Sequence, residues 1–214
     1  MPLHQEHIRL GAAGLPGELM LPADAGAVVI FAHGSGSGRL SPRNTMVARH
    51  LHGLGVGTML FDLLTDFEAA DRNNVFDIRL LTERMMAALD WCGEHARTRD
   101  LQIGLYGAST GAAAALSVAA AQPHAIFAVV SRGGRPDLAI DLQAVRAPTL
   151  LLVGGSDAPT LELNRIALRE LRCEKELAIV TGATHLFEEP GALEAVAEKT
   201  GGWFVSHLAA IRVT

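Results

Sequence analysis

Six short apolar runs constrain the fold of this chain more than any other feature. They begin near residues 27, 56, 101, 125, 149 and 176, and longer amphipathic or small-residue segments separate them. Strands that are covered on both faces have such uninterrupted apolar sequences, because neither face is exposed to water. Helices are predicted over residues 42–53, 75–97, 109–121, 160–171 and 191–208. The pattern predicts an α/β fold with a mostly parallel central sheet and helices on both of its faces.

The alternation of strands and helices continues without a repeat or a linker, so residues 1–214 are predicted to form a single domain. A chain of 214 residues can bury a full apolar core. We expect the first 22 residues to form an antiparallel hairpin at the sheet edge, with residues 15–18 (Leu-Pro-Gly-Glu) as its turn. The intervals between strands leave no room for a large cap domain. Residues 63–74 are an irregular insertion, for which a flap beside the pocket and a solvated loop are equally good interpretations.

Ser109 is the central residue of the pentapeptide 107–111 (Gly-Ala-Ser-Thr-Gly), which follows an apolar run and precedes an alanine-rich stretch. A serine on a tight turn from strand to helix has a strained backbone and presents its hydroxyl above the sheet. Glycines are expected on either side, because a Cβ there would clash with the neighbouring strand or helix. The pentapeptide alone is a weak signal, and a small-residue turn that only packs a helix is the alternative. The strand before it and the helix after it favour a nucleophile.

A serine nucleophile needs a base and a carboxylate that orients the base. Asp157 and His185 each follow a predicted strand, and the order Ser, Asp, His is that of the α/β-hydrolase fold. Asp157 could instead be a helix cap, and the chain has nine histidines. Asp137 and Asp141 are alternative acids. We favour Asp157, because the glycines at 154 and 155 let the chain turn tightly towards His185.

A glycine-rich loop, residues 34–38 (Gly-Ser-Gly-Ser-Gly), follows the first apolar run. Acyl transfer needs two backbone N–H groups that stabilise the oxyanion, and the fold takes one from this loop. The predicted donors are the N–H groups of Ser35 and Thr110. A phosphate-binding loop fits poorly, because Arg39 stands where a dinucleotide fingerprint has Gly or Ala, and the chain has no Gly-Lys-Ser/Thr. His33 is expected to support the loop by hydrogen bonding.

Polar residues are predicted at the carboxyl ends of the strands, the edge where open parallel sheets bind ligands. They are His33, Asp62, Ser109, Ser131, Asp157 and His185. Arg132 and Arg135 lie in the glycine-containing segment 131–135, beside this edge. Either arginine is a candidate for binding a carboxylate or phosphate on a substrate. The alternative is an ion pair with a neighbouring carboxylate such as Asp137, or simple solvation.

The formal charge of −5 and the pI of about 6.0 do not favour binding to nucleic acid or to an anionic membrane. The sequence has no leader-like start and no apolar stretch of membrane-spanning length, so a cytoplasmic location is expected. Cys92 and Cys173 have neither metal-binding nor redox spacing, and both are expected to pack. We expect neither a cofactor nor a metal, and the sequence leaves the oligomeric state open.

From residue 27 to residue 208 the chain resembles small, cap-less members of the dienelactone hydrolase-like branch of the α/β-hydrolases. The matching stretches are residues 31–38, 107–111, 131–138 and 182–190. The resemblance implies hydrolysis of a small carboxylic ester, thioester or lactone through an acyl-enzyme, without a cofactor. Dienelactone hydrolases proper have a cysteine where this chain has Ser109, so the resemblance supports the reaction type better than the substrate. Some relatives are joined to a phosphoribosyltransferase domain, which is not expected within these residues.

Two other interpretations use the same fold. An acyltransferase or perhydrolase would deacylate the same serine with a molecule other than water. A binding module would keep the fold without turnover, although the complete set of Ser109, Asp157 and His185 argues against this option.

Overall fold

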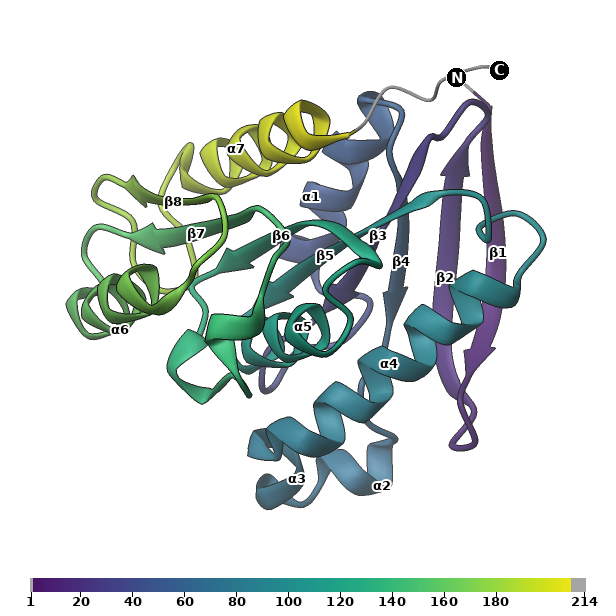
Figure 1. The fold of residues 1–214 in the computed structure, drawn as a ribbon, viewed down its shortest axis with the longest axis horizontal. Helices are drawn as coiled ribbons and strands as arrows, with labels where there is room; N and C mark the ends of the chain where they lie inside the picture. Colours follow the sequence, from purple (N-terminus) through teal and green to yellow (C-terminus); the bar gives the residue numbers. More distant parts are fainter. Residues whose placement is uncertain (1, 209–214) are drawn as a thin grey trace.

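The structure, a computed structural model, describes residues 2–208, which form one eight-stranded sheet in the order β1-β2-β4-β3-β5-β6-β7-β8 (Figure 1). The strands are β1 (Leu3–Leu10), β2 (Leu15–Pro22), β3 (Ala27–Ala32), β4 (Gly57–Phe61), β5 (Gln102–Ala108), β6 (Ile126–Arg132), β7 (Thr149–Gly154) and β8 (Lys175–Val180). Strands β3 to β8 are mutually parallel, whereas β2 is antiparallel to both β1 and β4. The predicted mostly parallel sheet is confirmed.

Helices cover both faces of the sheet, as predicted (Figure 1). Helices α1 (Pro42–Gly53) and α7 (Ala192–His207) lie on one face, and α4 (Ile78–Glu94), α5 (Thr110–Ala121) and α6 (Ala158–Glu170) lie on the other. The short helices α2 (Asp66–Ala69) and α3 (Arg72–Phe76) precede α4. Two 3₁₀ turns, η1 (Pro136–Leu138) and η2 (Leu142–Ala144), connect β6 to β7. No cap domain is inserted between these elements.

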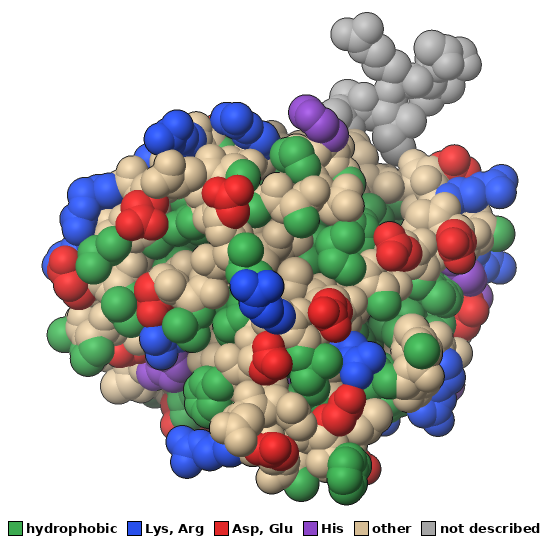
Figure 2. All heavy atoms as spheres, turned by 60° about the horizontal axis from the view of Figure 1, so that its bottom comes forward, with side chains coloured by type: hydrophobic (Ala, Val, Ile, Leu, Met, Phe, Trp, Pro, Cys, Tyr) green, Lys and Arg blue, Asp and Glu red, His purple; other side chains and the backbone are tan. Residues whose placement is uncertain are grey.

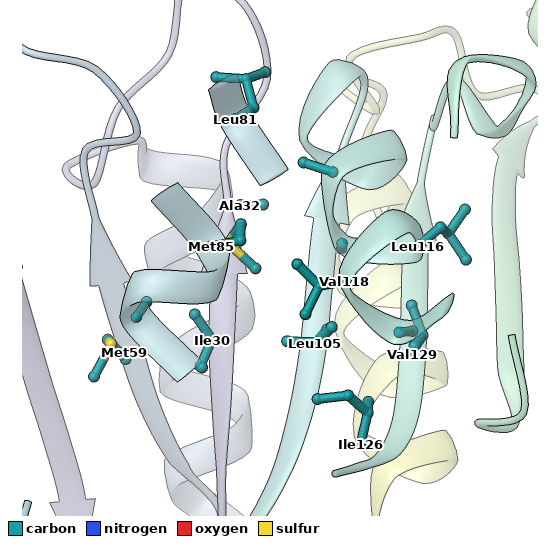
Figure 3. Packing of buried hydrophobic residues seen from close by; sticks show 14 of the residues in the cluster. Ile30, Ala32, Met59, Leu81, Met85, Leu105, Leu116, Val118, Ile126 and Val129 are labelled. Carbon is teal, nitrogen blue, oxygen red and sulfur yellow. The ribbon is translucent and has the colours of Figure 1, made fainter. Parts of the chain in front are cut away.

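Each face of the sheet carries its own apolar cluster, because successive strand residues point to opposite faces. In β3, Ile30 packs on the face covered by α4 and α5, and its neighbour Phe31 packs on the opposite face. Figure 3 shows the first cluster, in which Met85 of α4 and Val118 of α5 lie close to the strand residues Ile30 and Leu105. The first ten residues of α5 are all buried. Their small side chains fit the expectation that this alanine-rich helix packs tightly on the sheet.

The N-terminal hairpin forms as predicted, but its predicted turn at residues 15–18 is wrong. The turn lies between Gly11 and Gly14, which have φ values of 60° and 61°. Residues 15–18 instead belong to β2, in which Gly17 pairs with Phe61 of β4. A Cβ at Gly17 would lie 2.9 Å from the Phe61 Cβ and 3.0 Å from Ile8 Cγ1. Glycine is therefore present at 17 because neighbouring strands approach it closely, and not because the chain turns there.

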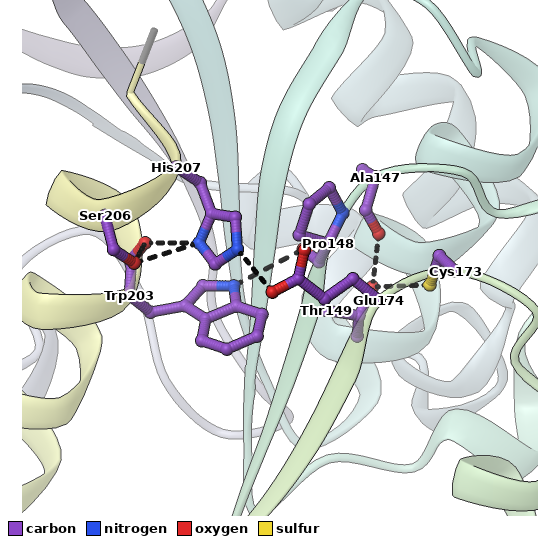
Figure 4. Close-up of polar contacts among 8 residues, drawn as sticks. All are labelled: Ala147, Pro148, Thr149, Cys173, Glu174, Trp203, Ser206 and His207. Carbon is purple, nitrogen blue, oxygen red and sulfur yellow. Dashed lines mark hydrogen bonds and ion pairs between the residues drawn. The ribbon is translucent and has the colours of Figure 1, made fainter.

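Polar contacts fasten the C-terminal helix to the β7–β8 side of the sheet (Figure 4). Trp203 Nε1 donates a hydrogen bond to the Pro148 carbonyl at 3.4 Å. His207 Nε2 lies 3.1 Å from Glu174 Oε1. These contacts hold the end of α7 beside the starts of β7 and β8, so they lie at the opposite sheet edge from the carboxyl ends of the strands.

Both cysteines are free thiols and take part in packing, as expected. Cys92 is buried in the core, and burial raises the pKa of its thiol to about 12. Cys173 Sγ lies 3.7 Å from Thr149 Oγ1.

The surface mixes acidic, basic and apolar side chains on the face seen in Figure 2. No helix within residues 2–208 combines the length and the apolar character that a membrane crossing requires.

Candidate active site

Ser109 joins β5 to α5 in a strained conformation, with φ 52° and ψ −122°. A positive φ is uncommon for any residue with a Cβ. The glycines on either side make the turn sterically possible: a Cβ at Gly107 would lie 2.7 Å from the Ala112 nitrogen. A Cβ at Gly111 would overlap the carbonyl oxygens of Ala32 and His33. The predicted reason for both glycines is therefore confirmed.

Asp157 and His185, distant in sequence, meet at the carboxyl ends of β7 and β8. The His185 Nδ1 atom lies 2.7 Å from Asp157 Oδ2. The other carboxylate oxygen, Oδ1, accepts a hydrogen bond of 3.3 Å from the Thr160 N–H and so caps α6. One carboxylate thus both caps a helix and contacts the predicted base. Partial burial alone would raise the pKa of Asp157, but the hydrogen bonds from Thr160 and His185 outweigh it, so the pKa is lowered.

Gly154 allows these two loops to approach each other. A Cβ on this residue would lie 2.6 Å from the Thr184 carbonyl oxygen, immediately before His185. The Ser156 N–H also donates a hydrogen bond of 2.9 Å to the Ala183 carbonyl. Backbone contact between the ends of β7 and β8 therefore fixes the separation of Asp157 and His185.

Ser109 and His185 line the same cavity, of about 210 Å³, which we call the smaller cavity. No hydrogen bond between their side chains is present among the described residues. Catalytic hydrogen bonds are often long without substrate and tighten when it binds. The His185 side chain is 42% exposed and Asp157 11%, so the base faces the cavity and its partner lies behind it.

The loop of residues 34–38 lies against the nucleophile. A Cβ on Gly34 would come within 2.9 Å of the Ser109 Cβ, so only glycine fits there. Ser35 lines the smaller cavity beside Ser109. Thr110 is the first residue of α5, and first-turn N–H groups have no acceptor within their own helix. Both predicted oxyanion donors therefore come from backbone close to Ser109.

His33 holds this loop, as expected. Its Nε2 lies 2.9 Å from the Leu63 N–H and must accept that hydrogen bond. Its Nδ1, 3.0 Å from the Gly34 carbonyl oxygen, is then the protonated nitrogen and donates. Burial lowers the pKa of His33, which favours this neutral form, although Gly34 and Asp62 act in the opposite direction. The imidazole thereby ties the glycine loop to the segment after β4.

The two candidate arginines have different surroundings. Arg132, at the end of β6, is 6% exposed and lines the smaller cavity. Arg135 donates hydrogen bonds of 2.9 and 2.8 Å to the two carboxylate oxygens of Asp137. Arg135 does not line the smaller cavity, so its surroundings match the alternative of an ion pair with Asp137.

The remaining polar residues predicted at this edge do not contact Ser109 or His185 through their side chains among the described residues. Ser131 is buried near the end of β6, its hydroxyl has no hydrogen-bond partner, and it does not line the smaller cavity. Asp62 pairs with Arg39, whose N–H donates to Asp62 Oδ1 at 2.7 Å. Asp137 and Asp141, the alternative acids, follow β6, and the carboxylate that contacts His185 is that of Asp157.

Residues 63–74 lie beside a second cavity of about 340 Å³, which we call the larger cavity. Most of this insertion is helical, because α2 and the start of α3 fall within it. Thr65 caps α2 with a capping box completed by Glu68. The larger cavity shares Gly34, Ser35 and Ser37 with the smaller one, so the glycine loop lies between the two.

Sequence reasoning missed two residues of the site. Arg43, in the first turn of α1, lines the smaller cavity. Its position five residues after the glycine loop was the available signal. Phe187, two residues after His185, is buried with φ 57°, and the Arg132 guanidinium lies 5.8 Å from its ring centroid. No sequence pattern predicts a positive φ for a phenylalanine.

Among residues 2–208 no group of three or more His, Cys, Asp or Glu is arranged to hold a metal ion.

Comparison with known proteins identifies the family of this chain. A crystal structure of a dienelactone hydrolase from Anabaena variabilis is 47% identical, with a TM-score of 0.90, over 96% of this chain and 98% of that chain. This chain belongs to the dienelactone hydrolase-like family of α/β-hydrolases. No protein-family model matches it. A serine hydrolase without a lid from Xanthomonas campestris, 22% identical with a TM-score of 0.79, shares the fold over 98% of each chain.

Curated relatives of this dienelactone hydrolase-like chain carry a different name. Proteins from two strains of Mycobacterium tuberculosis are 52% identical over 211 residues, which is 97% of this chain, and are provisionally named as phosphoribosyl transferases. The chain spans about half of their length, since the match covers 47% of each. The mycobacterial proteins that carry this name therefore contain a second region, similar in size to this chain, that the match does not cover.

Proposed function

We propose that this chain is a serine hydrolase that cleaves a small carboxylic ester, thioester or lactone through an acyl-enzyme intermediate. The observation that carries the proposal is the arrangement of three residues. Ser109 has the strained turn geometry of a nucleophile, it lines a cavity together with His185, and His185 Nδ1 is 2.7 Å from Asp157 Oδ2. Family membership supports the same reaction type.

The proposed mechanism assigns one role to each group. Ser109 Oγ attacks the substrate carbonyl while His185 takes its proton, and the same proton then goes to the leaving group. Asp157 holds His185 in the tautomer whose Nε2 can accept a proton. The N–H groups of Thr110 and Ser35 stabilise the developing oxyanion, a contribution of about 3–4 kcal/mol per donor in related enzymes.

The name of the mycobacterial relatives does not supply an alternative for this chain. The chain corresponds to about half of those proteins, and its described residues have the hydrolase fold throughout. We therefore place the proposed hydrolytic site within the residues that match those relatives.

An active-site fluorophosphonate probe tests the proposal, since it reacts with an activated serine. The wild-type protein should be labelled, and Ser109→Ala should not be. Turnover of short-chain esters should fall by about a million-fold in this variant. Thermal unfolding should be nearly unchanged, because the hydroxyl contributes little packing. A folded wild-type protein that resists the probe would favour a binding module, and a variant that keeps several per cent of activity would show that the nucleophile is misassigned.

A further inference from the structure

The two cavities beside the glycine loop differ in the charged and the large apolar side chains that line them. The smaller cavity contains Ser109 and His185 together with the guanidinium-bearing side chains of Arg43 and Arg132. The larger cavity is lined by His33, the glycine loop, Thr110 and, besides Ala69, four larger apolar side chains. These are Leu63, Leu64, Val75 and Leu81. It also has two carboxylates: Asp62, whose charge is paired with Arg39, and the exposed Asp66, which would disfavour an anion.

Arg132 is a buried charge without a counter-charge. Its side chain hydrogen-bonds to Asn44 Oδ1 at 3.5 Å, and its Nε has no hydrogen-bond partner. Within residues 2–208 no carboxylate forms an ion pair with it. A buried guanidinium without an anionic partner is costly to keep. Its position beside the nucleophile indicates that a ligand supplies the missing anion.

The neighbouring groups do not neutralise this charge. Arg43 adds a second guanidinium, whose Nε is also buried without a partner, and its Nη1 lies 3.8 Å from Oε1 of the 67% exposed Glu188. Tyr106 is buried near both arginines. Burial raises the pKa of Tyr106 although Arg132 and Arg43 oppose this shift, so the phenol stays neutral. Two positive charges thus face one exposed carboxylate.

The position of His185 decides which half of a substrate meets this charge. In acyl transfer, the base returns its proton to the leaving-group oxygen, so the leaving group must lie against His185. His185 lines the smaller cavity, the one that contains Arg43 and Arg132. Thr110, the residue after the nucleophile, lines the larger cavity, which leaves that cavity for the acyl chain.

We propose that the smaller cavity binds the leaving group, that this group is a small alcohol carrying a carboxylate or phosphate, and that the apolar acyl chain occupies the larger cavity. This inference rests on the proposed function. Ser109 Oγ forms a bond to the acyl carbon, the ester C–O bond breaks, and the departing alkoxide takes the proton from His185. Water then hydrolyses the acyl-enzyme and releases a carboxylic acid, which regenerates Ser109.

Two matched pairs of esters locate the anion-binding side. O-Butyrylglycolate and O-butyrylglycolamide differ in charge on the leaving group, whereas ethyl hydrogen succinate and ethyl succinamate differ in charge on the acyl group. Wild-type kcat/KM should favour the glycolate over the glycolamide and should not favour the charged succinate. The butyryl ester of 2-hydroxyethyl phosphate tests the phosphate arm, and the better of the two anionic alcohols identifies which anion the site prefers.

Arg132→Met, which keeps an apolar side chain in the buried position, tests the residue. kcat/KM for O-butyrylglycolate should fall by about 10- to 100-fold, the range for hydrogen bonds to charged groups. O-Butyrylglycolamide should change by less than about three-fold. The deacylation rate of the butyryl-enzyme should be unchanged, because the leaving group has already departed. Arg99→Met is the control, because it removes the same charge from a side chain that is 61% exposed at the opposite sheet edge.

Arg43→Met provides a second variant if Arg132→Met does not fold, because the Arg43 side chain is 30% exposed. It should lower activity towards the same anionic alcohols. Loss of activity confined to ethyl hydrogen succinate would overturn the proposal by placing the anion on the acyl side. Equal losses for charged and neutral esters would leave both arginines as structural residues. In either case fluorophosphonate labelling of the variants would still report an intact serine hydrolase, so this failure is distinguishable from failure of the proposed function.

Discussion

Replacing Asp157 by Asn separates the two roles of its carboxylate. Oδ1 caps α6 through the Thr160 N–H, and Oδ2 contacts His185 Nδ1 at 2.7 Å. An asparagine can keep the cap, because Asn and Asp are about equally good at this position. With its carbonyl oxygen on the Thr160 N–H, the asparagine turns its NH2 group towards His185 Nδ1. That group can only donate a hydrogen bond, so His185 would take the tautomer that is protonated at Nε2. That tautomer cannot accept the proton of Ser109.

We therefore expect Asp157→Asn to lower kcat by about ten-thousand-fold with little change in thermal stability. Asp157→Ala should lose both contacts. Its kcat should fall comparably, and loss of the cap should cost about 1 kcal/mol, or about 2–4 °C in Tm for a domain of this size. The assays are turnover of a short-chain ester and thermal unfolding of both variants.

The comparison variant is Asp137→Asn, which breaks the Arg135 ion pair but leaves the His185 contact in place. It should retain most of the wild-type activity. The reasoning would be refuted if Asp157→Asn kept more than a tenth of wild-type turnover, and a large loss in Asp137→Asn instead would transfer the role of acid to that residue.

Two further predictions concern the supports of the site. Gly111→Ala should destabilise the fold by about 1–3 kcal/mol, because its Cβ would overlap the Ala32 carbonyl oxygen. Gly202→Ala in α7 is the control: its Cβ meets no atom within 4 Å, so this variant should be stabilised by up to about 1 kcal/mol. Denaturant unfolding that ranks the two variants the other way would contradict this explanation of the turn at Ser109. Folding lowers the pKa of His33, so near this pKa the folded state binds fewer protons than the unfolded state. The stability that His33 contributes is therefore fully present above a pH of about 6.5 and is lost as the pH falls towards the lowered pKa. His33→Gln should flatten this part of the stability–pH profile, measured between pH 5 and 8, and leave the slope that comes from His52, whose pKa burial also lowers. Parallel profiles for both proteins would count against the assignment.

The parallel part of the fold was predictable because its signals are local. Apolar runs mark strands that are covered on both faces, and the predicted start at residue 27 is the first residue of β3. The hairpin turn was not predictable from the Pro16-Gly17 pair. That pair normally favours a turn, but the close approach of Ile8 and Phe61 to Gly17 is a property of the assembled sheet. The helical character of α2 and α3 was also missed, because elements this short have no periodicity.

The geometry around Asp157 and His185 was predictable because strand order and the flanking glycines bring them to one edge. For Asp157, the sequence posed helix cap and triad acid as alternatives, whereas its two oxygens make both contacts at once. The arginines show the limit of sequence reasoning. Arg132 and Arg135 lie in the same glycine-containing segment, yet only Arg135 has a carboxylate on the following turn.

The difference between these arginines follows from the strand geometry. Arg132 is the last residue of β6, so its side chain is directed by the sheet, and it lies over the Phe187 ring beside the smaller cavity. Arg135 lies beyond Gly133 and Gly134, where the chain has left the sheet and reaches Asp137. A charged side chain at a strand end can therefore be forced into a buried site, whereas one a few residues later finds its own counter-charge. The same edge that brings Ser109 and His185 together thus also sets the position of the proposed anion-binding site.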